Sequence, residues 1–571
     1  MSDQEKLELS VRGMTCDSCA THVTQALKSV PGVKEANVPG WQSGLATVIA
    51  KGDVKTEALT AAVREAGYSA TVCTRQSSLS SLRSEEGKEV ARNSGNSRNL
   101  FDLMVIGGGS AGFAAAIKGA ELGFKVALVE AGTIGGTCVN VGCVPSKTLI
   151  RSVELYHLAG QHRFRGVYTV PGRIDWPQVI AHKDELVNEL RQTKYTDVLA
   201  AYPEITYIQG RARLTGKNGV EIDPATPGGA GGKRYTPGKI IIATGAKPWA
   251  PPIPGLNEVP YLDSTSALDL KELPRSMIVL GANAVGLELA QAYARAGTYV
   301  TVLEVLPRIA PFEDSSLSVA LAEYLEEEGL RIVPNFKTTK VERRDGRYVL
   351  TGTQNDAELT FEAEQLLVAT GRRPNTSGMG LEEAGVKLGQ RGEILVNDLL
   401  LTHNPFVYAA GDVTGRDMFV YVAAYSGMLA AENALTDAGR TYDASYVPRI
   451  TFTDPQVASA GLTEDQAREQ GYEVRVSTLS MIHVPRALAA RDTRGLIKLV
   501  ANAATDQLLG AHILAPEAGE MIQTAVLAIR FGITVRELRE TMFPYLTNAE
   551  GLKLATIAFE KDVAKLSCCA G

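Results

Sequence analysis

The sequence lacks the long apolar runs that would place a chain in or across a membrane. No stretch approaches the roughly 20 apolar residues of a spanning helix. Residues 1–8 are polar and charged, unlike a secretory signal. Basic residues are not in excess either, since the formal net charge is −6, so neither nucleic acid nor an anionic membrane surface is indicated as a partner. We therefore expect a cytoplasmic protein with no membrane span.

Cysteine is scarce, with 7 residues among 571. An odd number in a long chain that is expected to be cytosolic disfavours a disulfide framework and favours metal or redox chemistry. Six of the seven form three close pairs, which are Cys16/Cys19, Cys138/Cys143 and Cys568/Cys569. The remaining Cys73 is interpreted as a small buried hydrophobic residue.

A chain of this length exceeds what a single core holds, so several domains are expected. Residues 1–73 follow the order strand–helix–strand–strand–helix–strand, which is the ferredoxin-like order. Residues 74–98 are rich in Ser, Gly and charge, which predicts a flexible linker. Beyond them strands and helices alternate, so we expect the α/β class, followed by a mixed α+β segment.

The first dinucleotide motif follows the apolar strand Phe101–Ile106. Gly107, Gly109 and Gly112 lie at the spacing of the Gly-x-Gly-x-x-Gly turn, and an Ala-rich helix follows. Such glycines let the backbone approach a pyrophosphate, and the helix N-terminus favours its charge. Glu130 ends the next strand, where an acid can bind a ribose hydroxyl. A glycine-rich turn without a ligand is the simpler alternative, but the strand, helix and acid together disfavour it.

A second motif follows strand Ser276–Leu280, with Gly281, Asn283 and Gly286 in its turn. Asn283 replaces the middle glycine, and Asn tolerates left-handed backbone angles better than most residues, so we expect the turn to form. Glu304 ends the next strand, where an acid binds a 2′-hydroxyl and repels a 2′-phosphate. That favours NADH.

The charge of Arg308, four residues after Glu304, could offset this preference, so NADH and NADPH both remain open. Three further strand ends are expected around the nucleotide sites. They carry Thr244 and Gly245, Gly371, and Asp412, the last of which could bind a ribityl or pyrophosphate group.

A redox pair follows the first nucleotide unit. Cys138 and Cys143 are about one helical turn apart, so they could form a disulfide or bind a metal together. A helix N-terminus and the cation Lys147 would lower a thiol pKa. Two buried structural cysteines are the alternative.

The segment Gly135–Lys147, together with the two nucleotide motifs, resembles the pyridine nucleotide-disulfide oxidoreductases. The resemblance implies FAD, NADPH or NADH, and a homodimer in which Cys143 faces the flavin and Cys138 exchanges with substrate. It implies the domains 99–261 (FAD-binding, first part), 262–372 (NAD(P)-binding), 373–445 (FAD-binding, return) and 446–566 (dimerisation). Beyond them, the adjacent Cys568 and Cys569 indicate that residues 567–571 are a C-terminal dithiol tail. Within the two Rossmann-like domains it adds as cofactor-binding residues Gly136, Thr137, Lys147 and Glu288.

The C-terminal part departs from the dithiol enzymes of that family. Their His-Pro-Thr-x-x-Glu segment carries a catalytic base, whereas here Tyr545 takes the His position ahead of Glu550. A tyrosine with an ordinary pKa near 10 is a poor proton shuttle at neutral pH. Ordinary dithiol–disulfide exchange is therefore disfavoured.

The N-terminal Gly-Met-Thr-Cys-x-x-Cys segment resembles heavy-metal-associated domains, although a redox Cys-x-x-Cys pair is the alternative. Soft thiolates select soft ions such as Cu(I) and Hg(II). With three cysteine pairs, a flavin fold and Tyr545, the chain resembles the mercuric reductases. That resemblance implies that Hg(II) and its thiol complexes are the substrate in mercury detoxification. It implies metal transfer from Cys16 and Cys19, through Cys568 and Cys569 of one subunit, to Cys138 and Cys143 of the other.

The same resemblance implies active-site roles for Tyr545 and Tyr195, although a packed aromatic is the alternative for Tyr195. Two rival functions remain open at this point. One is a dithiol–disulfide oxidoreductase such as lipoamide dehydrogenase or thioredoxin reductase. The other is a metal-buffering protein that uses residues 1–73.

Overall fold

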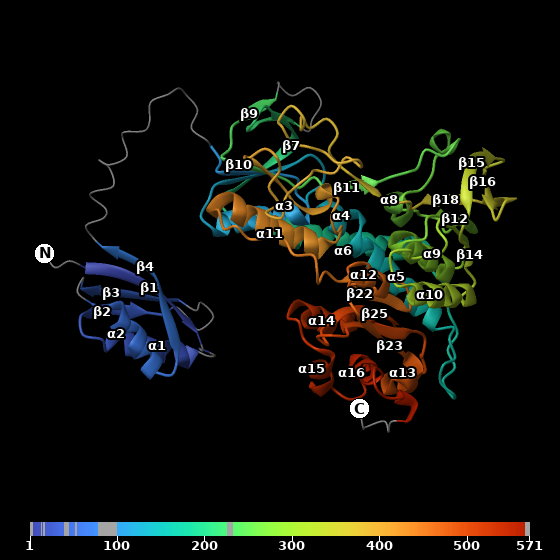
Figure 1. Cartoon of the computed structure of the whole chain (residues 1–571). Coiled ribbons are helices and arrows are strands. Elements are labelled where there is room, and N and C mark those ends of the chain that lie inside the picture. Colours follow the sequence, from blue (N-terminus) through green and yellow to red (C-terminus); the bar gives the residue numbers. More distant parts are fainter. Residues whose placement is uncertain are drawn as a thin grey trace. The chain divides into compact units, whose positions relative to one another are not determined.

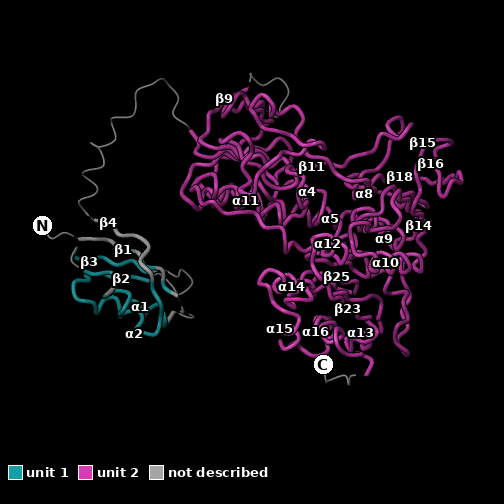
Figure 2. The backbone as a smooth tube through the Cα atoms, in the orientation of Figure 1, with its two compact units in different colours: residues 1–97 teal, residues 98–571 magenta. Residues whose placement is uncertain are grey.

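The computed structural model describes residues 4–12, 14, 17–38, 45–51, 54–77, 100–224 and 232–565. The chain divides into two compact units, residues 1–97 and residues 98–571 (Figures 1 and 2). Each unit has its own hydrophobic cores.

The first unit is a four-stranded antiparallel sheet with strand order β2-β3-β1-β4 and two helices (Figure 1). Its elements are β1 (Gln4–Arg12), α1 (Asp17–Lys28), β2 (Val33–Asn37), β3 (Leu45–Lys51), α2 (Thr56–Glu65) and β4 (Ser69–Ser77). Leu7, Leu9 and Val11 alternate along β1 and are buried in the core of the unit. This confirms the predicted ferredoxin-like βαββαβ order.

The first nucleotide-binding domain of the second unit has a seven-stranded sheet in the order β20-β10-β5-β6-β7-β8-β9. The strands are β5 (Leu103–Ile106), β6 (Val126–Glu130), β7 (Ile205–Thr215), β8 (Gly219–Pro224), β9 (Lys233–Tyr235), β10 (Lys239–Ile242) and β20 (Val407–Ala409). Helices α3 (Ser110–Glu121) and α11 (Val420–Thr436) pack against each other (Figure 1). Because β20 pairs with β10 in parallel, the chain returns to this domain after forming the next one.

The second nucleotide-binding domain has a parallel sheet in the order β14-β13-β12-β18. Its elements are β12 (Ser276–Leu280), α9 (Ala284–Ala296), β13 (Tyr299–Leu303), α10 (Ser315–Glu327), β14 (Arg331–Val333) and β18 (Gln365–Val368). An antiparallel sheet adds β15 (Lys337–Arg344), β16 (Arg347–Gln354) and β17 (Ala357–Ala363). The short strands β11 (Ala246–Pro248) and β19 (Arg372–Pro374) pair where the chain passes between the two domains.

The last domain is a five-stranded antiparallel sheet in the order β21-β22-β25-β24-β23. Its elements are β21 (Arg449–Thr451), β22 (Gln456–Gly461), α12 (Glu464–Glu469), β23 (Val474–Ser480), α13 (Pro485–Ala490), β24 (Leu496–Asn502), β25 (Leu508–Ala515), α14 (Ala518–Arg530), α15 (Val535–Glu540) and α16 (Glu550–Ile557). The expected α/β class, with two Rossmann-like domains and an α+β domain, is confirmed.

Among the described residues, five α-helices lie between β6 and β12. They are α4 (Gly136–Val141), α5 (Cys143–Leu158), α6 (Trp176–Arg191), α7 (Asp197–Ala200) and α8 (Ser264–Leu268). In the part of the chain that the structure describes, every helix falls short of the length and apolar character that a membrane crossing needs.

Candidate active site

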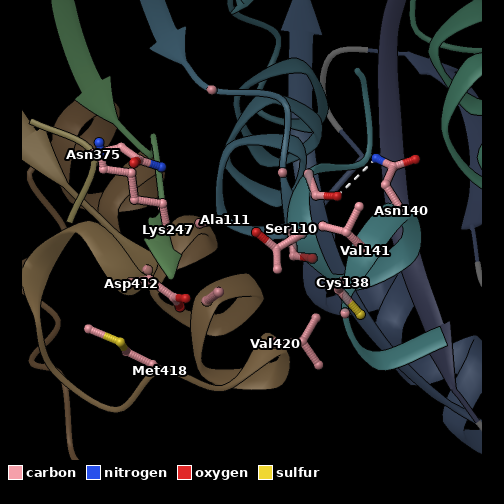
Figure 3. A pocket seen from close by; sticks show the side chains of 18 of the residues that line it. Ser110, Ala111, Cys138, Asn140, Val141, Lys247, Asn375, Asp412, Met418 and Val420 are labelled. Atoms are coloured by element: carbon pink, nitrogen blue, oxygen red, sulfur yellow. Dashed lines mark hydrogen bonds between the residues drawn. The ribbon is translucent and has the colours of Figure 1, made fainter. Parts of the chain in front are cut away.

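A cavity of about 1170 Å³ lies in the second unit, and Figure 3 shows Asp412 and Cys138 on different sides of it. Its volume exceeds the roughly 300–1,000 Å³ of ordinary small-molecule pockets, which suits a ligand as large as a dinucleotide. The sequence-predicted residues that line it are Gly107, Gly109, Glu130, Gly136, Thr137, Cys138, Cys143, Lys147, Thr244, Gly245, Glu288 and Asp412.

The glycines of the first turn are required by backbone contacts. Gly107 has a φ of 113°, and a Cβ on it would lie 2.3 Å from the carbonyl oxygen of Ala243. Gly112 does not line the cavity, but a Cβ there would lie 1.7 Å from the carbonyl oxygen of Gly107. Gly112 therefore allows α3 to begin directly behind the strand, so that its N-terminus faces the cavity.

Glu130 closes the same turn from the end of β6. Its two carboxylate oxygens accept hydrogen bonds from the backbone N–H groups of Gly108 and Gly132, each at 2.6 Å. A carboxylate fixed in this way can accept a further hydrogen bond from a ribose hydroxyl. The backbone walls, the helix N-terminus and the acid fit the adenosine diphosphate half of FAD.

Asp412 and Arg372 line the cavity together. Burial raises the pKa of Asp412, and the positive charge of Arg372 opposes that effect. Burial also lowers the pKa of Arg372. The guanidinium of Arg372 donates to the carbonyl oxygen of Ala246 in β11. Sequence reasoning missed Arg372, although it directly follows the predicted Gly371.

The two cavity thiols lie on successive helices, with Cys138 in α4 and Cys143 as the first residue of α5. Both are free thiols. The Cys138 thiol donates a hydrogen bond to the Cys143 sulfur, and this bond contributes most to lowering the pKa of Cys143 to about 7. Burial opposes the effect and the charge of Lys147 adds to it. The same bond, together with burial, raises the pKa of Cys138. The pair therefore loses the first of its two protons, from Cys143, as the pH rises through about 7.

Asn140 fixes the helix that carries Cys138. Its amide donates hydrogen bonds to the carbonyl oxygens of Gly136 and Ile134, each at 2.9 Å, and its labelled side chain is visible in Figure 3. Its oxygen accepts a hydrogen bond of 2.6 Å from the guanidinium of Arg191 at the end of α6. The short helix α4 is thus anchored at its start and against α6.

Lys147 lies one turn after Cys143 on α5, and its ammonium is 2.7 Å from the Glu288 carboxylate. The ammonium also lies 4.5 Å from the centroid of the Phe452 ring. The backbone N–H of Phe452 donates to the other oxygen of Glu288 at 2.9 Å. Three distant segments therefore fix one cation beside the thiols. Nothing in the local sequence around Phe452 indicated this contact.

Helix α9 carries Glu288, and the two helical turns after Glu288 make further contacts that fix the helix in place. The side chain of Gln291 accepts from the N–H of Asp454 and donates to its carbonyl oxygen, both at 2.8 Å. Arg295 is 2.8 Å from the Asp454 carboxylate and 2.6 Å from that of Glu328. Glu288, Gln291 and Arg295 share one helix face, so that face binds the segment that contains Phe452.

The two tyrosines from the sequence analysis lie in different surroundings. Tyr195 is in a π-helical turn (Gln192–Thr196), its ring centroid is 4.8 Å from that of Phe113, and it is hydrogen-bonded to Ser110, which lines the cavity. Burial raises the pKa of Tyr195. Tyr545 is 51% exposed in the loop before α16 and does not line the cavity of its own chain.

The second nucleotide turn lies beside this cavity. Gly281 has a φ of 103°, and a Cβ on Gly286 would lie 2.0 Å from the Gly281 carbonyl oxygen. The turn forms with Asn283 as expected, but for another reason. Asn283 has a φ of −104°, so no left-handed backbone angle is needed at this position. Gly371 does not line the cavity, and its carbonyl oxygen accepts from the N–H of Trp249 at 3.0 Å.

Several predicted cysteines lie outside the described residues, namely Cys16, Cys568 and Cys569. The same holds for the side chain of Cys73, whose backbone is part of β4. Cys19 is half-buried in the first turn of α1 and packs against the core of its unit.

Comparison with known proteins agrees with this architecture. Residues 101–427 match the model of the pyridine nucleotide-disulphide oxidoreductases, residues 447–556 that of their dimerisation domain, and residues 8–69 that of the heavy-metal-associated domain. The mercuric reductase of Staphylococcus aureus is 43% identical over the full length of both chains. That of Streptomyces lividans is 48% identical over 82% of this chain and 98% of its own.

Among solved structures, the HOCl-induced flavoprotein disulfide reductase RclA of Escherichia coli, as a Cu(II) complex, is 32% identical with a TM-score of 0.72. It covers 81% of this chain and 99% of its own. The glycine turns, the paired thiols and these similarities agree, and the chain belongs to the pyridine nucleotide-disulphide oxidoreductase family.

Proposed function

We propose that this protein reduces Hg(II) to Hg(0) with electrons from NAD(P)H, transferred through FAD, and so detoxifies mercury. The observation that carries the proposal is the pair of free thiols, Cys138 and Cys143, that line the cavity together. Soft thiolates select soft ions. The relatives named mercuric reductase, similar over nearly the whole chain, support the choice of ion.

The overall reaction balances as a two-electron transfer. A dithiolate complex of Hg(II), NAD(P)H and one proton give Hg(0), NAD(P)⁺ and two thiols. FAD, when bound, takes a hydride from the nicotinamide and supplies two electrons to the ion. Cys143 supplies a thiolate at neutral pH, and Cys138 gives up its proton as the ion binds between the two sulfurs.

The other predicted residues support this exchange. Lys147, held by Glu288, stabilises the negative charge of the thiolate. Two tyrosines are proposed to assist ligand exchange at the ion. They are Tyr195, which is hydrogen-bonded to Ser110, and Tyr545 of the partner subunit. The exposure of Tyr545 outside its own chain's cavity, and the dimerisation-domain match, support a homodimer with shared active sites.

We further propose that Cys16 and Cys19 capture the ion, and that Cys568 and Cys569 pass it to Cys138 and Cys143 of the other subunit. Pairs of similar affinity would let Hg(II) move by stepwise exchange without release. The thiols have to stay reduced for this, which favours the cytoplasm as the location.

A substrate panel tests the function. Oxidation of NADH and NADPH is measured with Hg(II)–thiol complexes, lipoamide, oxidised glutathione, oxidised thioredoxin and Cu(II), since a disulfide reductase is among the similar structures. Turnover with Hg(II) and release of Hg(0) vapour are expected. Turnover with a disulfide alone would show that the proposal is wrong.

A truncation separates the enzyme from a metal buffer. The variant that lacks residues 1–98 is expected to bind FAD and to reduce Hg(II) in excess thiol at the rate of the full chain. Loss of all reduction with FAD still bound would instead make the N-terminal pair part of catalysis.

A further inference from the structure

The two nucleotide-binding domains hold their acidic residue in the same way. Glu304 accepts hydrogen bonds from the N–H groups of Ala282 at 2.7 Å and Leu306 at 2.9 Å. These donors are the residue after the first glycine of the turn and the second residue after the acid. They correspond to Gly108 and Gly132, which donate to Glu130 in the first domain.

This equivalence is informative because the first domain serves FAD, whose adenosine ribose carries a free 2′-hydroxyl. The turns themselves also match, since Gly107 and Gly281 both have positive φ, at 113° and 103°. A Cβ on either glycine would lie within 2.6 Å of the carbonyl oxygen of the neighbouring strand end, in Ala243 or Ala369. The second domain therefore offers the same backbone turn and the same fixed carboxylate, which suit an adenosine ribose with a free 2′-hydroxyl.

The charge of Glu304 discriminates between the two nicotinamide cofactors. A carboxylate fixed by two N–H donors still has lone pairs that can accept from a 2′-hydroxyl. A 2′-phosphate at the same place would bring two or nearly two negative charges against this carboxylate, which costs binding free energy. Because both oxygens are engaged by the backbone, Glu304 cannot rotate away without leaving two N–H groups unpaired.

Arg308 does not supply the compensating cation. Its Nη2 donates to the carbonyl oxygens of Pro311 at 2.9 Å and Glu313 at 3.1 Å, within its own loop. Its Nε is buried without a hydrogen-bond partner. Turning this guanidinium toward a ribose phosphate would break both bonds. Val305 and Leu306, which directly follow the acid, present exposed apolar side chains.

We infer that the reductant of this enzyme is NADH and that Glu304, with Arg308 withdrawn into its loop, excludes NADPH. The inference rests on the proposed function only for the role of the nucleotide as electron donor. The inference decides between NADH and NADPH, both of which serve as reductants in the family.

The deciding measurement uses the full-length FAD-bound protein without Hg(II). Dissociation constants of NAD⁺ and NADP⁺ are determined by isothermal titration calorimetry, and reduction of the bound FAD by NADH and NADPH is followed anaerobically. NAD⁺ is expected to bind at least about 10-fold more tightly than NADP⁺. Equal or tighter binding of NADP⁺ would overturn the inference. Since no Hg(II) is present, this outcome is distinct from a failure to reduce mercury.

Two variants assign the effect to residues. Arg308→Ala is expected to leave the NADP⁺ dissociation constant unchanged, and selective weakening of NADP⁺ would show that Arg308 binds the phosphate, against the inference. Glu304→Ser is expected to reduce the difference between the dissociation constants of NAD⁺ and NADP⁺. The FAD content of the purified variant shows that it folds. If Glu304→Ser folds and the ratio of the two dissociation constants stays unchanged, the inference is also overturned. If the variant does not fold, the comparison of NAD⁺ and NADP⁺ binding to the wild-type protein decides the cofactor.

Discussion

The ammonium of Lys147 lies 2.7 Å from the carboxylate of Glu288, which places a residue of the second nucleotide-binding domain next to the thiol pair. Lys147 belongs to the helix that begins with Cys143, whereas Glu288 belongs to the helix that follows the second glycine turn. The Glu288 side chain is only 7% exposed, and its two oxygens contact the Lys147 ammonium and the Phe452 N–H. This ion pair therefore joins the helix of the thiols to the second nucleotide-binding domain, beside the apolar packing of α5 against α9.

The thiolate of Cys143 is expected to form with a midpoint near pH 7. The rate of its alkylation by iodoacetamide, followed by peptide mass spectrometry on the reduced protein, should rise with pH through that value. In Cys138→Ala the midpoint should move up by about one to two pH units, because a hydrogen bond to a charged group is lost. Cys19→Ala, which removes a thiol from the other unit, is the control. An unchanged midpoint in Cys138→Ala would contradict the assigned hydrogen bond.

Lys147→Met should raise the same midpoint by less than Cys138→Ala, because the charge of Lys147 contributes less than the hydrogen bond from Cys138. It should also lower the free energy of unfolding by about 2 kcal/mol, since Glu288 is left buried without its cation while Lys147 itself is partly exposed. The control is Lys118→Met, which removes a surface cation paired with Glu121 and Glu432. Equal effects of the two substitutions on the midpoint would argue against a role of Lys147 at the thiols.

Arg295→Met should destabilise the protein by about 3 kcal/mol, because Glu328 and Asp454 lose one of their two cationic partners in a buried site and keep only Arg494. Urea unfolding at a fixed protein concentration measures the difference. Arg347→Met, whose exposed side chain is 3.8 Å from Glu362, should change stability by less than about 1 kcal/mol. A similar loss in both variants would show that burial of the network is irrelevant.

The destabilisation by Arg295→Met should depend on pH. Although burial opposes it, the charges of Arg494 and Arg295 keep the pKa of Asp454 below its ordinary value. Its stabilising contribution is therefore present above the ordinary pKa of about 4 and is lost as pH falls through the lowered value in the folded protein. The difference in the free energy of unfolding between wild type and Arg295→Met should therefore become smaller below about pH 4. A difference that grows there would contradict the stabilising role of the Asp454 charge.

Mixed dimers should recover activity from two inactive parents if the sites are shared between subunits. Cys143→Ser and the double variant Cys568→Ala/Cys569→Ala are each expected to lose turnover of bulky Hg(II)–thiol complexes. Refolded or co-expressed in equal amounts, they should regain about a quarter of wild-type activity, because half of the dimers contain one complete site. No recovery in isolated mixed dimers would mean that the tail serves its own subunit. Mixing Cys143→Ser with Cys138→Ser, which affect the same site, is the control and should recover none.

The sequence predicted the parts of this site that depend on local spacing. Gly107, Gly112 and Glu130 follow from a strand, a turn and a helix, and the backbone contacts explain why those residue types are needed. Phe452 and Arg372 could not be predicted, because they reach the cavity through chain segments that only the tertiary fold brings together. The direction of the hydrogen bond between the cysteines was missed for a different reason, since it depends on the proton equilibrium between two coupled thiols.

Helix α9 limits how far this enzyme can be treated as a set of interchangeable modules. The family models divide the second unit between residues 427 and 447, yet Glu288 needs an N–H donor from beyond that division, as Gln291 does. A chimera that joins the nucleotide-binding part of this chain to the C-terminal part of a relative would have to reproduce the backbone position at residues 452–454. A C-terminal part that places residues 452–454 elsewhere would leave the buried side chains of Glu288 and Gln291 without these backbone partners.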